Sequence, residues 1–279
     1  MGNLPPIIVL CGGLGTRLGD LTKDKPKSMV EVAGKPFIAH QLELFKEKGI
    51  EEVILAVEHK KEQIIDFVGD GSRFGLEIKC CDTTLHNSVY SNEKYGSVTT
   101  AHTTIRGTGG ALLKTLKEMN IDTRTVFVTY GDSYLDIDYE EIFKYFMIHF
   151  FADENTALMT TVSNEGKYKV GVYDGIVRFV IPSFGWQRGW VESGVYDGCI
   201  DYGLMIFPVK MMIEYQDYDE NYPLDLTSVV TKLINNNVSV LDYRLFRTNP
   251  FHEIGSLQGL KETEKYILRR KNVNDTNNK

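Results

Sequence analysis

The sequence has no excess of basic residues. Its 279 residues include 31 lysines and arginines against 38 aspartates and glutamates, a formal net charge of −7 at pH 7. Proteins that bind nucleic acid along the phosphate backbone need a basic surface that displaces counterions. The composition therefore argues against a general nucleic-acid binder, although a few local cations would suffice for a small anionic substrate.

Cysteine is also scarce, and long apolar runs are missing. The four cysteines, Cys11, Cys80, Cys81 and Cys199, form no Cys-x-x-Cys pair and show no spacing with histidine that indicates zinc. No apolar run approaches the roughly 20 residues that span a bilayer, and the first residues lack the charged-then-apolar pattern of a signal peptide. We expect free thiols, no membrane partner and a cytoplasmic location.

A glycine-rich turn directly after an apolar strand is the most informative stretch. Residues 7–10 read Ile-Ile-Val-Leu, as expected for a strand buried on both faces of a parallel sheet. Gly12, Gly13 and Gly15 follow, and consecutive N–H groups in such a turn can point at phosphate oxygens and form an anion-binding nest. The sequence therefore predicts a site for a bulky anion at the end of this strand.

Two cations follow the glycines. Arg17 carries a planar guanidinium suited to phosphate, and Lys27 follows Pro26, whose ring locks the local backbone. The stretch is not the ATPase loop, which needs Gly-x-x-x-x-Gly-Lys-Ser/Thr. Nor is it the dinucleotide fingerprint, because Leu18 stands where the third glycine should be.

Together these motifs resemble the signature of the sugar-1-phosphate nucleotidylyltransferases, the NDP-sugar pyrophosphorylases. The match consists of Gly-Gly-Leu-Gly-Thr-Arg-Leu at 12–18, Pro-Lys-Ser-Met at 26–29 and Gly-Lys-Pro at 34–36. It is close over residues 7–60 and recurs in short motifs to about residue 260. The resemblance is specific for the family and uninformative about the sugar.

Strands and helices are expected to alternate in the first half. A helix is expected from Pro36 to Gly49, a buried strand at 53–57, a helix at 60–68 and a strand at 76–80. This spacing of βαβ units predicts a mostly parallel sheet with helices on both faces. With the resemblance, it implies an α/β, Rossmann-like fold of the nucleotide-diphospho-sugar transferase type.

The second half is expected to add a small antiparallel extension on the sugar side. Strands are expected at 156–162, 168–173, 176–180 and 200–207, with Asp174-Gly175 as a hairpin turn.

Asp136 and Asp138 are interpreted as turn and cap residues before a helix at about 139–149. Ser256 is interpreted as the cap of a closing helix that ends near Arg270.

We expect one nucleotidyltransferase domain over residues 1–270. Its nucleotide half spans about 7–150 and its sugar half about 151–260, and a polar, frayed tail follows at 271–279. Residues 82–106 are rich in polar side chains and interrupt the alternation. Long loops of this kind are usually functional or mobile, so this insertion either lies over the nucleotide pocket or is a surface elaboration.

The resemblance implies how a nucleotide would be held. Arg17 and the loop N–H groups would bind the β- and γ-phosphates, while Lys27 would neutralise charge around the α-phosphate; these two are the catalytic candidates. The turn Gly107-Thr108-Gly109-Gly110 would lie against the base, where the absence of a Cβ lets a base edge approach. The nucleotide-binding residues implied are Leu10, Gly12, Gly13, Gly15, Thr16, Arg17, Thr108, Gly109 and Asp132.

The resemblance also implies Mg²⁺ as cofactor, held by Asp132 and Glu253. Asp132 follows an apolar strand at 125–130, and open α/β sheets place ligands at the carboxyl ends of such strands. Glu253, in Phe-His-Glu-Ile-Gly at 251–255, stands where the family carries Asp-Ile-Gly-Thr-Pro. Glutamate keeps the charge but is one methylene longer.

The sugar side departs most from the family pattern. Gly171 matches a glycine that lets a sugar lie against the backbone, and Asp201 stands where the family has Asn-Ala-Gly. The usual Glu-Lys-Pro is replaced by Val-Ile-Pro at 180–182, so Glu192 is considered as a substitute for the acid. The sugar-phosphate-binding residues considered are therefore Gly171, Glu192 and Asp201.

The expected reaction is transfer of a nucleotidyl group from an NTP to a sugar 1-phosphate, with release of pyrophosphate. The expected partners are these two substrates, with no nucleic acid and no membrane; the oligomeric state is open, with a homodimer as one candidate. Three alternatives stay open: a cytidylyltransferase acting on a non-sugar phosphate, a non-catalytic sugar-nucleotide sensor, and a glycosyltransferase of related fold. The last is ranked low, because its Asp-x-Asp string at 136–138 lies beyond Asp132.

Overall fold

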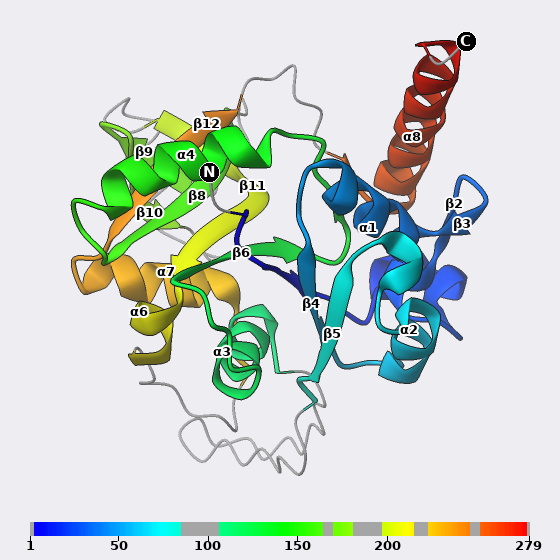
Figure 1. Cartoon of the computed structure of the whole chain (residues 1–279), viewed down its shortest axis with the longest axis horizontal. Coiled ribbons are helices and arrows are strands. Elements are labelled where there is room, and N and C mark those ends of the chain that lie inside the picture. The colour runs from blue at the N-terminus through cyan, green and yellow to red at the C-terminus, as the bar shows by residue number, and fades with distance from the viewer. Residues whose placement is uncertain are drawn as a thin grey trace, which may run out of the picture.

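The computed structural model describes residues 3–84, 106–163, 170–180, 197–214, 223–245 and 252–277. These residues form one nine-stranded sheet between two layers of helices (Figure 1), so the α/β class predicted from the sequence is confirmed. Most of the insertion at 82–106, and Glu192, lie outside the described residues.

The first half of the sheet is parallel. Its strand order is β5-β4-β1-β6, and the four strands are β1 (Ile7–Leu10), β4 (Glu52–Val57), β5 (Glu77–Asp82) and β6 (Thr125–Tyr130). Strand β1 lies between β4 and β6, with Leu10 opposite Ala56 on one side and Tyr130 on the other. The chain segments that follow β1 and β6 therefore leave the sheet at the same edge.

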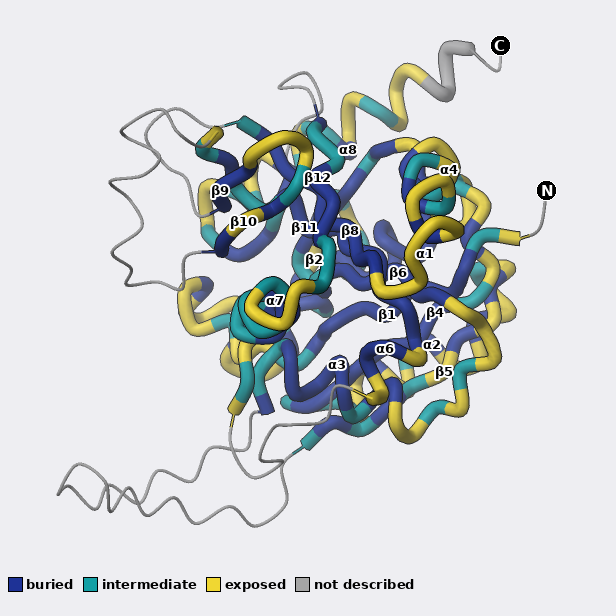
Figure 2. The backbone as a smooth tube through the Cα atoms, turned by 90° about the vertical axis from the view of Figure 1, so that its left-hand side faces the viewer, coloured by how far each residue is buried: buried dark blue, intermediate teal, exposed yellow. Residues whose placement is uncertain are grey.

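Alternating residues of β1 supply the two cores that hold the helices. Ile7 and Val9 pack with α1, α2 and α4 on one face, while Ile8 and Leu10 pack with α3, α6 and α7 on the other. In Figure 2 the strands at the centre are buried and the exposed residues lie mainly on the helices around them. The helices are α1 (Phe37–Glu47), α2 (Lys61–Val68), α3 (Thr108–Glu118), α4 (Tyr139–Phe150), α6 (Val209–Glu214) and α7 (Leu226–Asn235).

The second half continues the same sheet. The long strand β11 (Asp197–Pro208) runs antiparallel to β6, and the order continues β11-β8-β12-β10-β9. The predicted antiparallel extension is thus joined to the parallel half edge to edge, with one further parallel pair, β8 with β12. These strands are β8 (Thr156–Ser163), β9 (Val170–Tyr173), β10 (Ile176–Val180) and β12 (Ser239–Leu245).

Several predicted local features are confirmed. Asp174 and Gly175 join β9 to β10 with positive φ at both positions, 52° and 69°, as a two-residue hairpin turn requires. Asp138 caps α4, because its carboxylate accepts the N–H of Glu141 at 2.8 Å. Asp136, which the sequence suggested as a turn or cap residue, instead forms ion pairs with Lys48 and Arg270.

Short elements that the periodicity did not predict join distant parts of the chain. β7 (Ser133–Tyr134) pairs antiparallel with β13 (His252–Glu253), and β2 (Glu31–Val32) pairs with β3 (Lys35–Pro36). Three 3₁₀ turns complete the described elements: η1 (Thr16–Thr22), η2 (Lys27–Met29) and η3 (Ser72–Phe74).

The closing helix α8 (Leu257–Asn277) is longer than predicted. Ser256 caps it by accepting the N–H of Gly259 at 3.0 Å, as expected. The frayed tail expected from residue 271 is instead helical to Asn277 and runs away from the rest of the molecule (Figure 1). No glycine or proline follows Gly259, so nothing stops propagation of the helix. No helix in the described ranges is apolar over a length that would cross a bilayer.

Asp136 anchors α8 to the body of the protein. Its carboxylate pairs with Lys48 at 2.6 Å and with Arg270 Nε at 2.6 Å, and it accepts the hydroxyl of Tyr266 at 3.0 Å. These contacts hold the pKa of Asp136 below its usual value although burial alone would raise it. Asp136 is therefore charged in the folded protein.

We expect Asp136→Asn to lower the free energy of unfolding by about 1–3 kcal/mol, the scale of hydrogen bonds to charged groups. Urea denaturation at pH 7 measures this loss. Glu154→Gln is the matched control, because its pair with Arg124 is mostly exposed and should change stability by less than about 1 kcal/mol. Equal effects of the two substitutions would contradict an anchoring role for Asp136.

Candidate active site

The glycine turn after β1 bends into η1. Gly15 has φ of +67°, a conformation that favours glycine, and a Cβ there would lie 2.8 Å from Thr22 Cγ2. Thr22 closes the turn by donating its hydroxyl to the carbonyl of Gly15 at 3.0 Å. Lys60, just before α2, donates to the carbonyls of Thr22, at 3.1 Å, and of Lys23. The loop is thus braced by the neighbouring βα unit.

The predicted residues of the glycine turn differ in what they face. Gly13 is exposed and a Cβ there would meet no atom within 4 Å, so its backbone is open to a ligand. At Gly12, by contrast, a Cβ would lie 2.7 Å from Glu58 Oε2. Thr16 and Arg17 are exposed at the start of η1.

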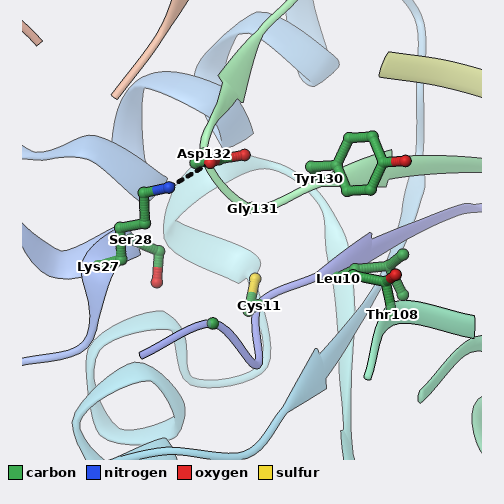
Figure 3. Close-up of a pocket in the computed structure, with 9 residues that line it drawn as sticks. Leu10, Cys11, Lys27, Ser28, Thr108, Tyr130, Gly131 and Asp132 are labelled. Atoms are coloured by element: carbon green, nitrogen blue, oxygen red, sulfur yellow. Dashed lines mark hydrogen bonds and ion pairs between the residues drawn. The ribbon is translucent and has the colours of Figure 1, made fainter. Parts of the chain in front are cut away.

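Lys27 and Asp132 lie together at the carboxyl edge of the sheet. Lys27 begins η2, Asp132 follows β6, and their side chains form an ion pair (Figure 3). Gly131 lets the chain after β6 approach the chain after β1, because its N–H donates to the Leu10 carbonyl at 2.9 Å and a Cβ there would lie 2.8 Å from Cys11 Sγ. Burial raises the pKa of Cys11, so this thiol is a packing residue between strand and loop.

A cavity opens between these segments. It brings together five of the predicted site residues, namely Leu10, Gly13, Lys27, Thr108 and Asp132. Figure 3 labels all of these except Gly13. Its remaining lining residues are Cys11, Ser28, Tyr130 and Gly131. Open α/β sheets bind ligands outside the carboxyl ends of their strands, and this cavity occupies that position.

Glu253 reaches the same place from the other end of the chain. The β7–β13 ladder sets Glu253 opposite Ser133, and the N–H of Ile254 donates to the Asp132 carbonyl at 2.9 Å. A Cβ on Gly255 would overlap Glu253 Oε2 and would lie 3.0 Å from Lys27 Nζ and 3.1 Å from Arg17 Nη2. Arg17, Lys27 and Glu253 therefore converge over Gly255, beside Asp132.

Two carboxylates at this point could contribute to a cation site. Asp132 and Glu253 offer oxygen ligands, and Mg²⁺ commonly uses one or two carboxylates together with substrate phosphates. In this structure Asp132 is paired with Lys27, and Glu253 accepts hydrogen bonds from the N–H of Gly255 and the hydroxyl of Ser256. Within the part of the chain that is described, no cluster of three or more metal-ligating side chains occurs. The donor set thus fits an ion that a bound phosphate helps to hold.

The turn at Thr108 and Gly109 packs against the chain before α7. A Cβ on Gly109 would lie 2.7 Å from the Asp225 carbonyl, and the Gly109 N–H donates to the Leu224 carbonyl at 2.7 Å. The chain before α7 therefore fills the space that the missing side chain leaves. Thr108 does line the cavity, and its hydroxyl accepts the N–H of Leu226 at 2.9 Å.

The sugar-side candidates lie along β9 and β11. Asp201 accepts the hydroxyl of Tyr130 at 3.0 Å and so contacts a residue of the cavity wall. Burial, followed by the Asp201 carboxylate, raises the pKa of Tyr130, which keeps the phenol protonated as a donor. At Gly171 a Cβ would overlap the ring of Phe179, so that side chain covers the glycine.

Glu58 is a buried acid against Gly12 of the glycine turn that the sequence interpretation missed. It follows β4, is only 5% exposed, and its Oε1 accepts the N–H of Arg106 at 3.1 Å and the hydroxyl of Thr83 at 3.2 Å. Burial raises its pKa from 4.5 to about 7, against the lowering effect of these hydrogen bonds. The signal was the one used for Asp132, an acid directly after a buried parallel strand.

Comparison with known proteins gives a consistent picture. The model of the family "Nucleotidyl transferase" matches residues 7–184. A D-glycero-alpha-D-manno-heptose 1-phosphate guanylyltransferase of Campylobacter jejuni is 39% identical over 135 residues, which cover 48% of this chain and 51% of that protein. The mannose-1-phosphate guanylyltransferase catalytic subunit beta of Drosophila melanogaster is 30% identical over 200 residues, which cover 70% and 48%.

The chain spans about half the length of these curated relatives. Among solved structures, HddC from Yersinia pseudotuberculosis complexed with GMP-PN superposes with a TM-score of 0.65 at 22% identity, covering 94% of this chain and all of that one. The inositol-1-phosphate CTP transferase of T. maritima gives a TM-score of 0.65 at 17% identity, covering 95% and 97%. These likenesses confirm the predicted fold type.

The raised pKa of Glu58 predicts a pH-dependent stability. A carboxyl whose folded pKa of about 7 exceeds its unfolded value of 4.5 stabilises the fold fully below pH 4.5, and this contribution is lost as the pH rises through 7. We expect a loss on the order of 3 kcal/mol for the wild type across this range. In Glu58→Gln the loss should be absent, so the variant gains stability relative to the wild type as the pH rises.

Urea denaturation between pH 4.5 and 8 measures the difference between the two proteins. Glu52→Gln, at the amino end of the same strand, is the control and should follow the wild-type curve because Glu52 is partly exposed. A constant difference between Glu58→Gln and wild type over this range would show that Glu58 does not titrate there.

Proposed function

Because the chain belongs to the nucleotidyl transferase family, we propose that it transfers a nucleotidyl group from an NTP to a sugar 1-phosphate. The products are an NDP-sugar and pyrophosphate. The observation that carries the proposal is the convergence of Arg17, Lys27, Asp132 and Glu253 at one edge of the cavity. Two cations and two acids at one point suit a reaction between two highly charged phosphates.

In the proposed reaction a phosphate oxygen of the sugar 1-phosphate attacks the α-phosphorus of the NTP. A new P–O bond forms, and the bond from the α-phosphorus to the bridging oxygen of pyrophosphate breaks. The attacking oxygen is already an anion at neutral pH, so no side chain needs to remove a proton from it. The chain must therefore supply alignment and charge neutralisation, as in other phosphoryl-type transfers.

Each charged residue has a defined part in this proposal. The exposed backbone of Gly13 and the guanidinium of Arg17 bind the β- and γ-phosphates. Lys27, next to the cavity, stabilises the negative charge that develops around the α-phosphate and the departing pyrophosphate. Asp132 and Glu253 would hold Mg²⁺, which would supply positive charge that reduces the repulsion between the phosphates.

The guanylyltransferase names of the sequence relatives make GTP the first nucleotide to test as donor. The heptose and mannose 1-phosphates of those names are likewise the first acceptors to test.

A screen of pyrophosphate release tests the proposal directly. Purified protein is assayed with each of GTP, ATP, CTP, UTP and dTTP against a panel of sugar 1-phosphates, with Mg²⁺ and with EDTA. We expect turnover with at least one pair, dependent on both substrates and abolished by EDTA. Choline phosphate in the acceptor panel tests the alternative of a non-sugar phosphate. Nucleotide binding without release of pyrophosphate from any pair would favour the sugar-nucleotide sensor instead.

Replacement of the catalytic cation gives a second prediction. We expect Lys27→Ala to lower kcat by about 100-fold or more, the scale of losing one preorganised charge-stabilising donor. Lys79→Ala is the control, because Lys79 is an exposed lysine of β5 that pairs only with Glu52 and Glu77 among the described residues. Turnover of Lys27→Ala within a few-fold of the control would contradict the assignment.

A further inference from the structure

Glu58 joins three separate segments behind the glycine turn. Its Oε1 accepts hydrogen bonds from Thr83, just after β5, and from the backbone of Arg106, just before α3. The side chain packs against Gly12, after β1. Thr83 is fully buried and Arg106 is 7% exposed, so the carboxylate is fixed in position.

The second oxygen of this carboxylate is different. Within the described residues, Glu58 Oε2 has no hydrogen-bond partner, although the residue is 95% buried. Oε2 is not among the fully buried polar atoms that lack a partner, so it keeps some access to solvent, and a ligand that donates a hydrogen bond can reach it.

Gly12 leaves this oxygen uncovered. A Cβ at position 12 would lie 2.7 Å from Oε2 and 2.9 Å from Cδ of Glu58. Any larger residue there would occupy the space directly over the carboxylate. The turn that follows Arg106 carries Thr108, which lines the cavity with Leu10 and Gly13. Glu58 therefore lies between the glycine turn and the segment that leads to the cavity wall.

Above pH 7, where Glu58 is ionised, its carboxylate accepts hydrogen bonds and donates none. We infer that Glu58 Oε2 accepts a hydrogen bond from the exocyclic amino group of the nucleobase, which makes Glu58 a specificity-determining residue of the proposed nucleotide site. The inference rests on the proposed function and deepens it. Guanine, adenine and cytosine carry an amino group, whereas uracil and thymine present carbonyl oxygens in its place. The site should therefore favour amino-bearing bases.

Glu58→Gln is the decisive variant, because it exchanges one atom. The N–H of Arg106 and the hydroxyl of Thr83 both donate to Oε1, so the amide oxygen of glutamine takes that position and its NH₂ group replaces Oε2. An acceptor thereby becomes a donor that suits carbonyl-bearing bases. The variant removes a buried charge and should fold.

The experiment, run at pH 8 so that Glu58 is ionised, measures kcat/KM for GTP, ATP, CTP, UTP and dTTP, with 2′-deoxy-GTP as a control for ribose contacts. Calorimetry measures the binding of the matching nucleoside diphosphates. We expect the wild type to prefer an amino-bearing base. In Glu58→Gln the preference for amino-bearing over carbonyl-bearing nucleotides should fall by about 10- to 100-fold, the scale of one hydrogen bond to a charged group. Glu52→Gln, the same substitution at the other end of β4, should keep the wild-type preference.

Three results would overturn the inference. Wild-type preference for UTP or dTTP would exclude an amino group as the ligand. An equal loss for all five nucleotides in Glu58→Gln would make Glu58 a brace of the glycine turn. If Glu58→Gln lowered only the preference for GTP over 2′-deoxy-GTP, the donor to Oε2 would be a ribose hydroxyl and not a base amino group.

The outcome can be separated from that of the proposed function. Absence of pyrophosphate release by the wild type with every substrate pair would contradict the proposed function, while the calorimetric comparison of nucleoside diphosphates would still test Glu58.

Discussion

The parallel pairing of β1 with β6 is the constraint on which the site depends. Its register sets Leu10 opposite Tyr130, so the glycine turn and the Gly131–Asp132 turn leave the sheet side by side. Both strands are buried on two faces, and a shift by one residue would exchange the side chains that face the two cores. The position of Asp132 relative to the phosphate-binding turn is therefore fixed by hydrophobic packing on both sides of the sheet.

Charge pairing then balances the site. Lys27 and Asp132 neutralise each other, with 14% and 25% of their side chains exposed. In the proposed reaction Lys27 pairs with a phosphate of the nucleotide and Asp132 pairs with a cation. The ion pair between the two side chains is thus replaced by one ion pair with each ligand. Such an exchange conserves charge within the site, which makes the binding of nucleotide and of cation mutually favourable.

Much of the architecture could be predicted from local sequence signals. Apolar periodicity predicts strands over 53–57 and 125–130 and helices over 36–49 and about 139–149. The structure places the ends of these elements within one or two residues of the predicted ones. The convergence of Lys27, Asp132 and Glu253 was expected only from a family resemblance, because no local pattern links residues more than 100 positions apart. What could not be predicted depends on tertiary contacts: the glycine at 109 is required by the chain at Leu224 and Asp225.

The position of Glu253 shows how a distant helix can shape the site. Glu253 lies on a two-residue ladder with β7, and such a short ladder has few hydrogen bonds to hold it. Helix α8 follows β13 in the chain. Its Ile267 packs in a small core with Phe37, Tyr134 and Ile254. Its Arg270 pairs with Asp136. Thr263 of α8 also donates its hydroxyl to the Glu253 carbonyl at 2.9 Å. The second acid is therefore held in place by the packing of α8 against α1 and β7, so the closing helix belongs to the structure of the site although it contributes no charged group to it.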